Sequence, residues 1–540
     1  MALRQGTASV VLSKRRIFQG LQPRRYKNKP ARMSSRPIQL DGERLTLDQL
    51  FAVALERLPA EIPAAARDRM NASRGVIERL LASDVKVYGV NSGFGKMASV
   101  RISPDEIRHL QINLVRSHAC GVGAPLSEPA VRAVVALRAN ALAKGFSGVR
   151  PVIAETLVAM LNRGVLPVIP SKGSVGASGD LAPLAHLAQV VIGEGYAIYD
   201  GKRLSGADAM RAAGISPLVL EAKEGLALLN GTQAMLALLA LALREAEMAV
   251  DTADVAAALS LDALRGSPAA FDARISNLRP YAGQSISARN IERLNRGSEI
   301  RESHRSALID PRVQDPYSLR CAPQVHGAVR DALRQVRSTV TIEINSATDN
   351  PLVFADSNEV ISGGNFHGQP LAIAADQLAV ALATLGGISE RRIEQMTNPQ
   401  TSQLPAFLVR EAGLHSGFMI LQVTAAALAS EMKILAAPHS VDSIPTSANQ
   451  EDYVSMGMSA ANRLAPALEN LRSILAIELL AACQGLDFLA PLRTGPAARR
   501  AYELVRSLSK TVEVDRSLAP DIEAVASGIA SASFAQMLRE

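Results

Sequence analysis

Apolar positions in the second half of the chain recur at the spacing of a helix face over long stretches. Ala and Leu dominate these stretches, which are interrupted mainly at Gly or Pro: Leu226–Leu264, Val325–Ser346, Gln369–Glu394, Leu414–Ala437 and Ala460–Cys483. Apolar residues at i, i+3, i+4 and i+7 are typical of an α-helix, and a helix that is apolar on most faces is buried. The pattern predicts a mainly α protein built on a bundle of long helices, and we expect this bundle to be oligomeric.

The first half of the chain has shorter elements and more turns. Helical spacing is visible in five segments: Leu45–Leu58, Ala64–Ala82, Ile107–Ser117, Pro129–Lys144 and Val152–Arg163. β-branched residues from Val85 predict a strand that runs into a glycine loop, and Tyr196–Arg203 is typical of a hairpin. We therefore predict three parts: a tail at 1–36, a mixed α/β part at 37–224 and a long-helix part at 225–540.

The basic character of the chain lies in its first residues. The net charge is +7, but residues 1–36 hold ten Lys or Arg and no Asp or Glu, which leaves −3 for the remainder. A body of this charge gives no argument for nucleic-acid binding. The tail has the composition of a targeting segment, and it also fits an upstream extension of the reading frame before Met33. We expect it to be disordered and dispensable.

Composition bounds the class of protein and its compartment. Hydrophobic residues make up 48% and charged residues 20%, as in a globular protein. Three cysteines, Cys120, Cys321 and Cys483, lie far apart, so we expect no disulfide framework, no metal site and a cytoplasmic location. The longest apolar run, at 234–243, is too short to span a bilayer, and we expect no membrane association.

A run of small residues at 171–186 contains Ala177-Ser178-Gly179 ahead of a predicted helix. Because Gly179 has no Cβ, this tripeptide can fold back so that one backbone nitrogen approaches a carbonyl two residues earlier. Asp180 stands at the N-cap position of the helix that follows. On these residues alone, the run is also explained as a glycine-rich turn before a capped helix.

Polar clusters interrupt or flank the long helices. Five of them stand out: Asn230–Gln233, Gln314–Cys321, Glu343–Pro351, Gly363–Gly368 and Asp442–Asp452. Each cluster alone is explained by a cap, a turn or a solvated face. Five in one helical protein indicate a shared pocket.

Taken in order, these motifs resemble the aromatic amino acid ammonia-lyases, which act on histidine, phenylalanine or tyrosine. Gly176–His186 resembles the signature of the family, and the other segments follow in the same order: Tyr88–Gly95, Ser117–Gly123, Glu224–Gln233, Gln314–Gln324, Glu343–Pro351, Gly363–His367 and Ser440–Asp452. The resemblance covers about residues 38–530. It implies a long-helix fold of the fumarase/aspartase-like type, with the Ala177-Ser178-Gly179 loop carried by the mixed N-terminal part.

The resemblance also implies a built-in electrophile. In this family, Gly179 N would attack the Ala177 carbonyl, and loss of water would give 4-methylidene-imidazol-5-one (MIO) from Ala177, Ser178 and Gly179. Such an electrophile is something that no ordinary side chain supplies, so no external cofactor is expected. The implied enzyme is a carbon–nitrogen lyase that eliminates ammonia from an aromatic L-amino acid to leave a trans-2-enoate. The implied assembly is a homotetramer whose active sites are shared between subunits.

Roles for individual residues follow from the same resemblance. Tyr88 would be the base that removes the β-proton of the substrate, and Arg320 would pair with the substrate carboxylate. The remaining contacts, to the prosthetic group, the amino acid end or the ring of the substrate, would come from Asn230, Gln314, Tyr317 and Phe366.

The choice of substrate stays open between two branches of the family. Ser117-His118 and Glu431 resemble the histidine lyases, since a carboxylate suits an imidazolium better than a phenyl ring. Histidine, giving urocanate, is our leading prediction. Other positions depart from that branch and favour tyrosine or phenylalanine, giving p-coumarate or cinnamate: Met432, Ala437–His439, Tyr453, Ala322 and Gly368-Gln369. An aminomutase with the same prosthetic group is a third possibility.

Overall fold

The computed structural model describes residues 36–82, 89–90, 102–103, 106–306, 309–310 and 312–539. The chain divides into two units, Met1–Pro37 and Ile38–Glu540. The predicted tail before residue 36, the strand predicted from Val85 and most of the predicted glycine loop, Tyr88 included, lie outside the described residues. The boundary near residue 225, which falls within the second unit, remains a prediction.

The N-terminal part of this unit is mixed in character. Its helices are α1 (Leu47–Leu55), α2 (Ala64–Leu81), α3 (Ile107–His118), α4 (Glu128–Ala143), α5 (Pro151–Arg163), α6 (Leu181–Val191), α7 (Gly206–Ala212) and α8 (Glu224–Leu229). Its strands are β1 (Ile38–Gln39), β2 (Ala60–Glu61), β3 (Val122–Pro125), β4 (Leu166–Pro167), β5 (Pro170–Lys172), β6 (Tyr196–Tyr199) and β7 (Lys202–Ser205). The hairpin predicted around Asp200-Gly201 is confirmed by the β6–β7 pairing.

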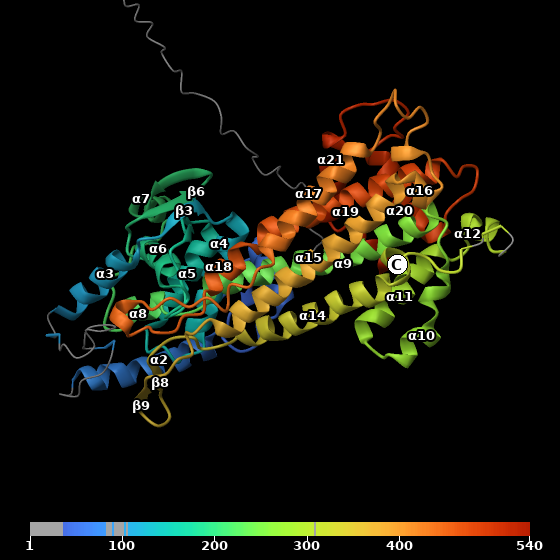
Figure 1. Ribbon diagram of the computed structural model, residues 1–540. Coiled ribbons are helices and arrows are strands. Elements are labelled where there is room, and N and C mark those ends of the chain that lie inside the picture. The colour runs from blue at the N-terminus through green and yellow to red at the C-terminus, as the bar shows by residue number, and fades with distance from the viewer. Residues whose placement is uncertain are drawn as a thin grey trace, which may run out of the picture. The chain divides into compact units, whose positions relative to one another are not determined.

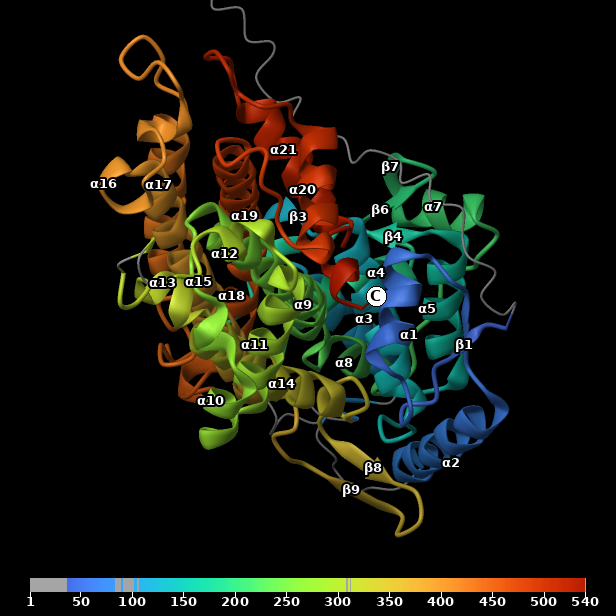
Figure 2. The same ribbon diagram turned by 90° about the vertical axis from the view of Figure 1, so that its right-hand side faces the viewer.

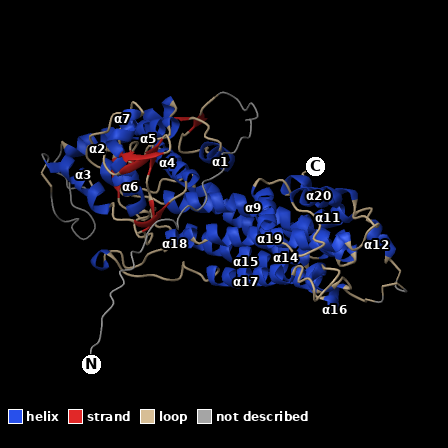
Figure 3. Cartoon of the chain, turned by 90° about the horizontal axis from the view of Figure 1, so that it is seen from above, coloured by secondary structure: helices blue, strands red, loops and turns tan. Residues whose placement is uncertain are grey.

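Among the residues that the structure describes, the strands form small sheets of two or three strands (Figure 3). β1 pairs with β2 in parallel, β3 with β5 antiparallel, and β4, β6 and β7 form an antiparallel sheet in the order β4-β6-β7. Further along the chain, β8 (Leu352–Phe354) and β9 (Glu359–Ile361) make a hairpin. This hairpin lies beside α2, where Val353 packs on Val76 and Ile77 (Figure 2).

Five long helices form the bundle, as predicted (Figure 1). They are α9 (Gln233–Ala263), α14 (Ala322–Glu343), α15 (Gln369–Thr397), α17 (Met419–Leu435) and α19 (Leu464–Asp487). The other helices of this part are α10 (Ala273–Leu278), α11 (Ala282–Asn295), α12 (Glu299–Ser303), α13 (Tyr317–Arg320), α16 (Pro399–Ser402), α18 (Gly457–Asn462), α20 (Pro496–Leu508) and α21 (Ala519–Ala530). Short 3-10 turns occur at Pro268–Phe271, Ala406–Leu408, Ser447–Asn449 and Ala535–Leu538.

The direction of the helices follows from the pairs between α9 and α14. Near the start of α9, Thr232 donates to Glu343 at the end of α14, and near the end of α9, Asp254 pairs with Arg330. The two helices are therefore antiparallel, and one end of the bundle holds the start of α9 together with the end of α14. The opposite end holds α13 and the start of α14.

Helix α15 is long and apolar enough to cross a membrane by length and composition, and it is the helix among the described residues that meets this test. However, 61% of its most apolar window is buried inside the bundle. It also carries Asp376 and Arg392, which are buried and paired with Arg463 and Glu478. In this fold α15 is a core helix.

Candidate active site

The turn Ala177-Ser178-Gly179 lies just before α6 and is held against the break between α8 and α9. Gly179 has a φ of +74°, and a Cβ at this position would collide with the carbonyl of Gly231. The Asp180 N–H donates to that carbonyl at 2.7 Å, and Gly179 and Gly231 form an isolated parallel bridge. Only glycine accommodates both the backbone angle and the close approach at residue 179.

Two polar side chains contact Ser178 from distant segments. The Asn230 side-chain amide donates to the Ser178 carbonyl at 2.8 Å. The Ser178 hydroxyl donates to Glu451 Oε1 at 3.1 Å, and Thr446 holds the other carboxylate oxygen at 2.7 Å. The backbone carbonyl and the hydroxyl of one serine are thus bound by residues 52 and 273 positions away along the chain.

The segment that carries Glu451 also covers the turn. The Met456 N–H donates to the Val175 carbonyl at 2.8 Å, and the Ser455 hydroxyl donates to the Gly176 carbonyl at 3.1 Å. Ala177 packs in a small apolar cluster with Val454 and Met456. These contacts fix the position of the turn and leave it little contact with water.

His118 lies near Glu451 at the end of α3. Its Nδ1 is 2.9 Å from the Leu114 carbonyl and 3.0 Å from the Ser117 hydroxyl. Because a carbonyl only accepts, Nδ1 carries a proton and Nε2 is left as an acceptor. Burial lowers the pKa of His118, against the opposing effects of the Leu114 carbonyl and the Glu451 charge. The imidazole is therefore neutral at pH 7.

Phe366 lies in the loop before α15, at the same end of the bundle. It is half-buried, and Gly368, two residues on, packs so closely on Met235 and Ser455 that no Cβ fits. His367 Nε2 donates to the Tyr453 carbonyl at 3.2 Å, and the two rings stack with their centroids 6.2 Å apart. The structure thus brings Ser117, His118, Ala177, Ser178, Gly179, Asn230 and Phe366 to one end of the bundle.

Asp180 differs from its predicted role in one respect. It is the N-cap residue of α6, as expected, but its side chain makes no capping bond to that helix. Its carboxyl group accepts from the Met235 N–H at 2.8 Å, at the start of α9, and from Ser174 at 3.1 Å. Burial raises the pKa of Asp180 to about 7, and these hydrogen bonds oppose the rise. Asp180 thus joins the turn to a helix that begins 53 residues further on.

Gln314, Tyr317 and Arg320 lie at the other end of the bundle. Helix α14, which follows α13 directly, has 22 residues and spans about 33 Å at 1.5 Å per residue. Tyr317 is 71% exposed, and the Arg320 guanidinium lies 4.4 Å above its ring. Arg320 Nε donates to the Asp315 carbonyl at 3.0 Å, and its two Nη atoms meet no acceptor among the described residues.

Glu431 is also apart from Ser178 within the chain. It is exposed on α17, next to Met432, which packs on Gly386 in the middle of α15. The carboxylate that reaches Ser178 is Glu451, which the sequence reasoning missed as an individual residue. The polar stretch Asp442–Asp452 was the signal that contained it.

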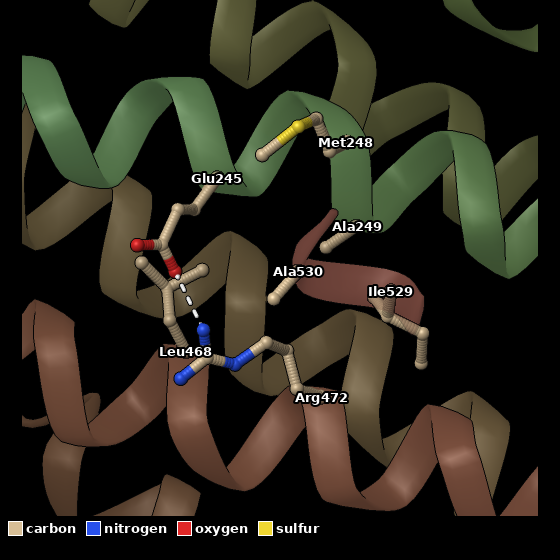
Figure 4. A pocket seen from close by; sticks show the side chains of 7 residues that line it. All are labelled: Glu245, Met248, Ala249, Leu468, Arg472, Ile529 and Ala530. Atoms are coloured by element: carbon tan, nitrogen blue, oxygen red, sulfur yellow. Dashed lines mark hydrogen bonds and ion pairs between the residues drawn. The ribbon is translucent and has the colours of Figure 1, made fainter. Parts of the chain in front are cut away.

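Two small cavities between described residues of the bundle lie away from the turn. One is between α9, α19 and α21, where Glu245 and Arg472 approach at 3.3 Å beside Met248 and Leu468 (Figure 4). The other lies beside Gln484 and Phe488 near the end of α19. Both are lined by residues with no connection to Ser178, so the site is identified by its polar contacts and not by a cavity.

Comparisons with known proteins agree with this geometry. The sequence profile of the family described as aromatic amino acid lyase matches residues 45–507. The chain is 54% identical to a histidine ammonia-lyase of Koribacter versatilis over 93% of this chain and 99% of that one, and 52% identical to one of Myxococcus xanthus over 94% and 99%.

Solved structures give the same result for the fold. The histidine ammonia-lyase of Trypanosoma cruzi has a TM-score of 0.86 at 43% identity, covering 93% of this chain and 95% of that one. The tyrosine aminomutase of Streptomyces globisporus has a TM-score of 0.89 at 41% identity, covering 93% and 98%. The predicted fold and enzyme class, a lyase of aromatic amino acids, are confirmed. The chain belongs to the aromatic amino acid lyase family.

Proposed function

We propose that this protein is a histidine ammonia-lyase, which eliminates ammonia from L-histidine to leave urocanate. The observation that carries the proposal is the environment of Ser178: an amide donor on its carbonyl and a carboxylate on its hydroxyl, beside the neutral imidazole of His118. The names of the relatives at 52–54% identity support the same substrate.

The turn fits an MIO group formed from Ala177, Ser178 and Gly179. Gly179 has the positive φ and the lack of a Cβ that a compressed turn requires. Cyclisation would consume the Ala177 carbonyl and leave the Ser178 carbonyl in place, so the Asn230 amide is positioned to hold the ring by its oxygen. The group would supply an electrophile for the substrate amine.

The chain's own residues then bind and orient the substrate. Glu451, released from the Ser178 hydroxyl once that hydroxyl is lost, is an acceptor for the substrate's ammonium group or imidazole. His118 Nε2, a neutral acceptor, lies on the same side. Tyr88, which lies outside the described residues, keeps its proposed role as the base that takes the β-proton.

The substrate carboxylate requires a contribution from another copy of the chain. The Nη atoms of Arg320 meet no acceptor within the described ranges, but Arg320 lies at the far end of the bundle from Ser178. Helix α17, rich in apolar residues, buries only Leu421, Ala425 and Met432 within the chain and exposes Ile420, Val423 and Ile434. An exposed apolar helix face of this kind is typical of an interface. We propose a homotetramer in which Gln314, Tyr317 and Arg320 of one subunit complete the site around Ser178 of another.

The deciding experiment is a substrate panel with the purified protein. L-histidine, L-tyrosine and L-phenylalanine are supplied separately, and urocanate, p-coumarate and cinnamate are followed by absorbance. We expect turnover of histidine to exceed that of the other two. Faster turnover of tyrosine or phenylalanine would overturn the proposed substrate while leaving the lyase chemistry in place.

A second candidate is supported by the likeness to the tyrosine aminomutase, whose TM-score is 0.89. His367 and Tyr453 form a stacked aromatic pair beside Phe366, and this surface suits a phenol ring. An aminomutase would return ammonia to the β-carbon. Chromatography of the products of L-tyrosine separates the two functions, because only an aminomutase accumulates a β-amino acid.

A further inference from the structure

The break between α8 and α9, residues Asn230–Thr232, is the platform on which the Ser178 turn rests. α8 ends at Leu229 and α9 begins at Gln233. The last carbonyls of the first helix and the first N–H groups of the second therefore lack partners within their own helices. Asn230 and Gly231 lie in this break, and both contact the turn.

Arg138, on α4, supplies donors to the carbonyl side of the break. Its Nη1 donates to the Asn230 carbonyl at 2.9 Å and to Gln233 Oε1 at 2.8 Å, and its Nη2 donates to the Ala227 carbonyl. The C-terminal end of a helix carries partial negative charge, which a guanidinium stabilises. The opposite side is capped by Asp180, which accepts from the Met235 N–H. A buried donor, Arg138, and a buried acceptor, Asp180, thus close the break from its two sides.

The burial of Arg138 is unusual because it has no carboxylate partner within hydrogen-bond distance among the described residues. The side chain is 1% exposed, and the nearest acidic group to act on it, Asp349, is bound to Lys223 Nζ at 2.7 Å. Burial lowers the pKa of Arg138 to about 10, which leaves it charged at pH 7. Burying a cation without a salt bridge costs folding free energy, so packing alone does not explain why an arginine stands at position 138.

The contacts of Arg138 are also close enough to fix the backbone of the break. At Gly231 a Cβ would collide with Arg138 Nη1 and Gln233 Oε1. The Asn230 carbonyl is held by Arg138, while the Asn230 amide holds the Ser178 carbonyl. Asn230 therefore links the Arg138 guanidinium to the turn, because its carbonyl accepts from Arg138 and its side-chain amide donates to Ser178.

We propose that Arg138 is a positioning residue for the prosthetic group, fixing the Asn230–Gly231 break so that the Asn230 amide is aimed at the Ser178 carbonyl oxygen. The role rests on the proposed lyase function, and its effect on the Ser178 carbonyl acts through Asn230. It assigns a buried guanidinium to the reaction although Arg138 touches neither the substrate nor the cyclised tripeptide.

A double-mutant cycle tests this role. Arg138→Met and Asn230→Ala are made singly and together, and kcat and KM for the preferred substrate are measured. We expect Arg138→Met to lower kcat by about 10- to 100-fold, the range for outer-shell partners, with little change in KM. In the Asn230→Ala background the same substitution should lower kcat by less than about threefold, because coupled positions are not additive. Losses that multiply would overturn the proposal.

Arg132→Met is the matched control. Arg132 lies on the same helix, is 4% exposed, and also donates to backbone carbonyls, those of Val53 and Leu161, at 3.0 and 3.2 Å. It makes no contact with the break. We expect Arg132→Met to lower the melting temperature as Arg138→Met does but to keep kcat. An equal loss of kcat in the control would reduce Arg138 to a structural role and overturn the proposal. If Arg138→Met fails to fold, Arg138→Lys, which keeps the charge with fewer donor directions, replaces it in the cycle.

Amide hydrogen exchange provides a readout without activity. In a Ser178→Ala background, which cannot form the prosthetic group, we expect Arg138→Met to speed exchange in peptides covering 178–181 and 229–235, and Arg132→Met to leave them unchanged. Unchanged exchange in Arg138→Met would overturn the proposal. If the wild-type protein shows no lyase turnover, the proposed function fails by itself, and the exchange result still decides whether Arg138 fixes the break.

Discussion

The two ends of the long-helix bundle carry different halves of the proposed chemistry. At the end where α9 begins, Ser178 is bound on its carbonyl by Asn230 and on its hydroxyl by Glu451, both from the same chain. At the other end, Tyr317 is 71% exposed, and the Arg320 Nη atoms meet no acceptor in the part of the chain that the structure describes. Among the described residues, the first half has its polar partners in place within one subunit, whereas the second half leaves the Arg320 Nη atoms without one. The difference supports the proposal that the chain builds its own electrophile and takes its carboxylate-binding group from a neighbouring subunit.

The largest loss of activity is expected when the Ser178 hydroxyl is removed. We expect Ser178→Ala to lower kcat by on the order of 10³-fold or more, because the electrophile cannot form. Trp is absent from the chain, so a chromophore on the long-wavelength side of the Tyr band should be visible in the wild type and lost in the variant. Ser205→Ala, at the N-cap of α7 and without contact to the turn, is the control that should keep the band. A wild type without the band would contradict the prosthetic group.

The assignment of the second half to a neighbouring subunit is tested by mixing. Arg320→Met alone should be almost inactive, as Ser178→Ala is. Co-expression of the two variants should restore part of the activity, because some sites then combine an intact Ser178 with an intact Arg320 from another copy. Recovered turnover in the purified hetero-oligomer is the expected result. No recovery, with mixed oligomers present by mass spectrometry, would place both residues in the same subunit's site.

The two candidate carboxylates allow a sharper comparison within the site. Glu451→Gln should lower kcat/KM by about 10- to 100-fold, since its charge faces the position of Ser178 Oγ. Glu431→Gln, on the exposed face of α17, tests the sequence prediction that Glu431 faces the imidazole. We expect Glu451 to give the larger loss for histidine. A larger loss of kcat/KM in Glu431→Gln would show that Glu431 is the carboxylate that faces the imidazole. It would also make α17 part of a site shared between subunits.

The smallest effect concerns pH and stability at the Ser178 end. Burial lowers the pKa of His186, whose Nε2 accepts from the Gly121 N–H at 3.1 Å. Above the ordinary histidine pKa near 6.5, folded and unfolded states are both neutral and the stability is fully present. As the pH falls below that value, the unfolded chain binds a proton more readily, and stability is lost. The melting temperature should fall from pH 7 to pH 5, and His186→Gln should fall less. An identical slope in the variant would remove His186 from this effect.

Much of the fold could be predicted because helix periodicity is a local property. The five long helices follow from apolar spacing, and the β6–β7 hairpin follows from Asp200-Gly201. The polar residues Asn230–Gln233 marked the place where the predicted helix at 226–264 divides into α8 and α9. In each case the residues that decide the structure lie within a few positions of one another.

What could not be predicted depends on residues far apart in the chain. Asp180 stands at a cap position, but its carboxyl group bonds to Met235, a choice made by tertiary packing. Arg138 lies in an apolar helix, and the spacing of residues in that helix does not indicate a contact with the Asn230 carbonyl, 92 residues away. Among the acidic residues, the sequence favoured Glu431, whereas the structure places Glu451 on Ser178. Motif order could name the parts of the site but not the end of the bundle to which each belongs.

The antiparallel pairing of α9 and α14 sets a distance as well as a direction. In the proposed tetramer the length of α14 sets the distance between Arg320 and the Ser178 end of its own subunit. Deleting four residues from α14 would shorten that distance by about 6 Å, roughly one helical turn. Surface loops of this protein can therefore vary in length, whereas these helices can change only together and in every subunit at once.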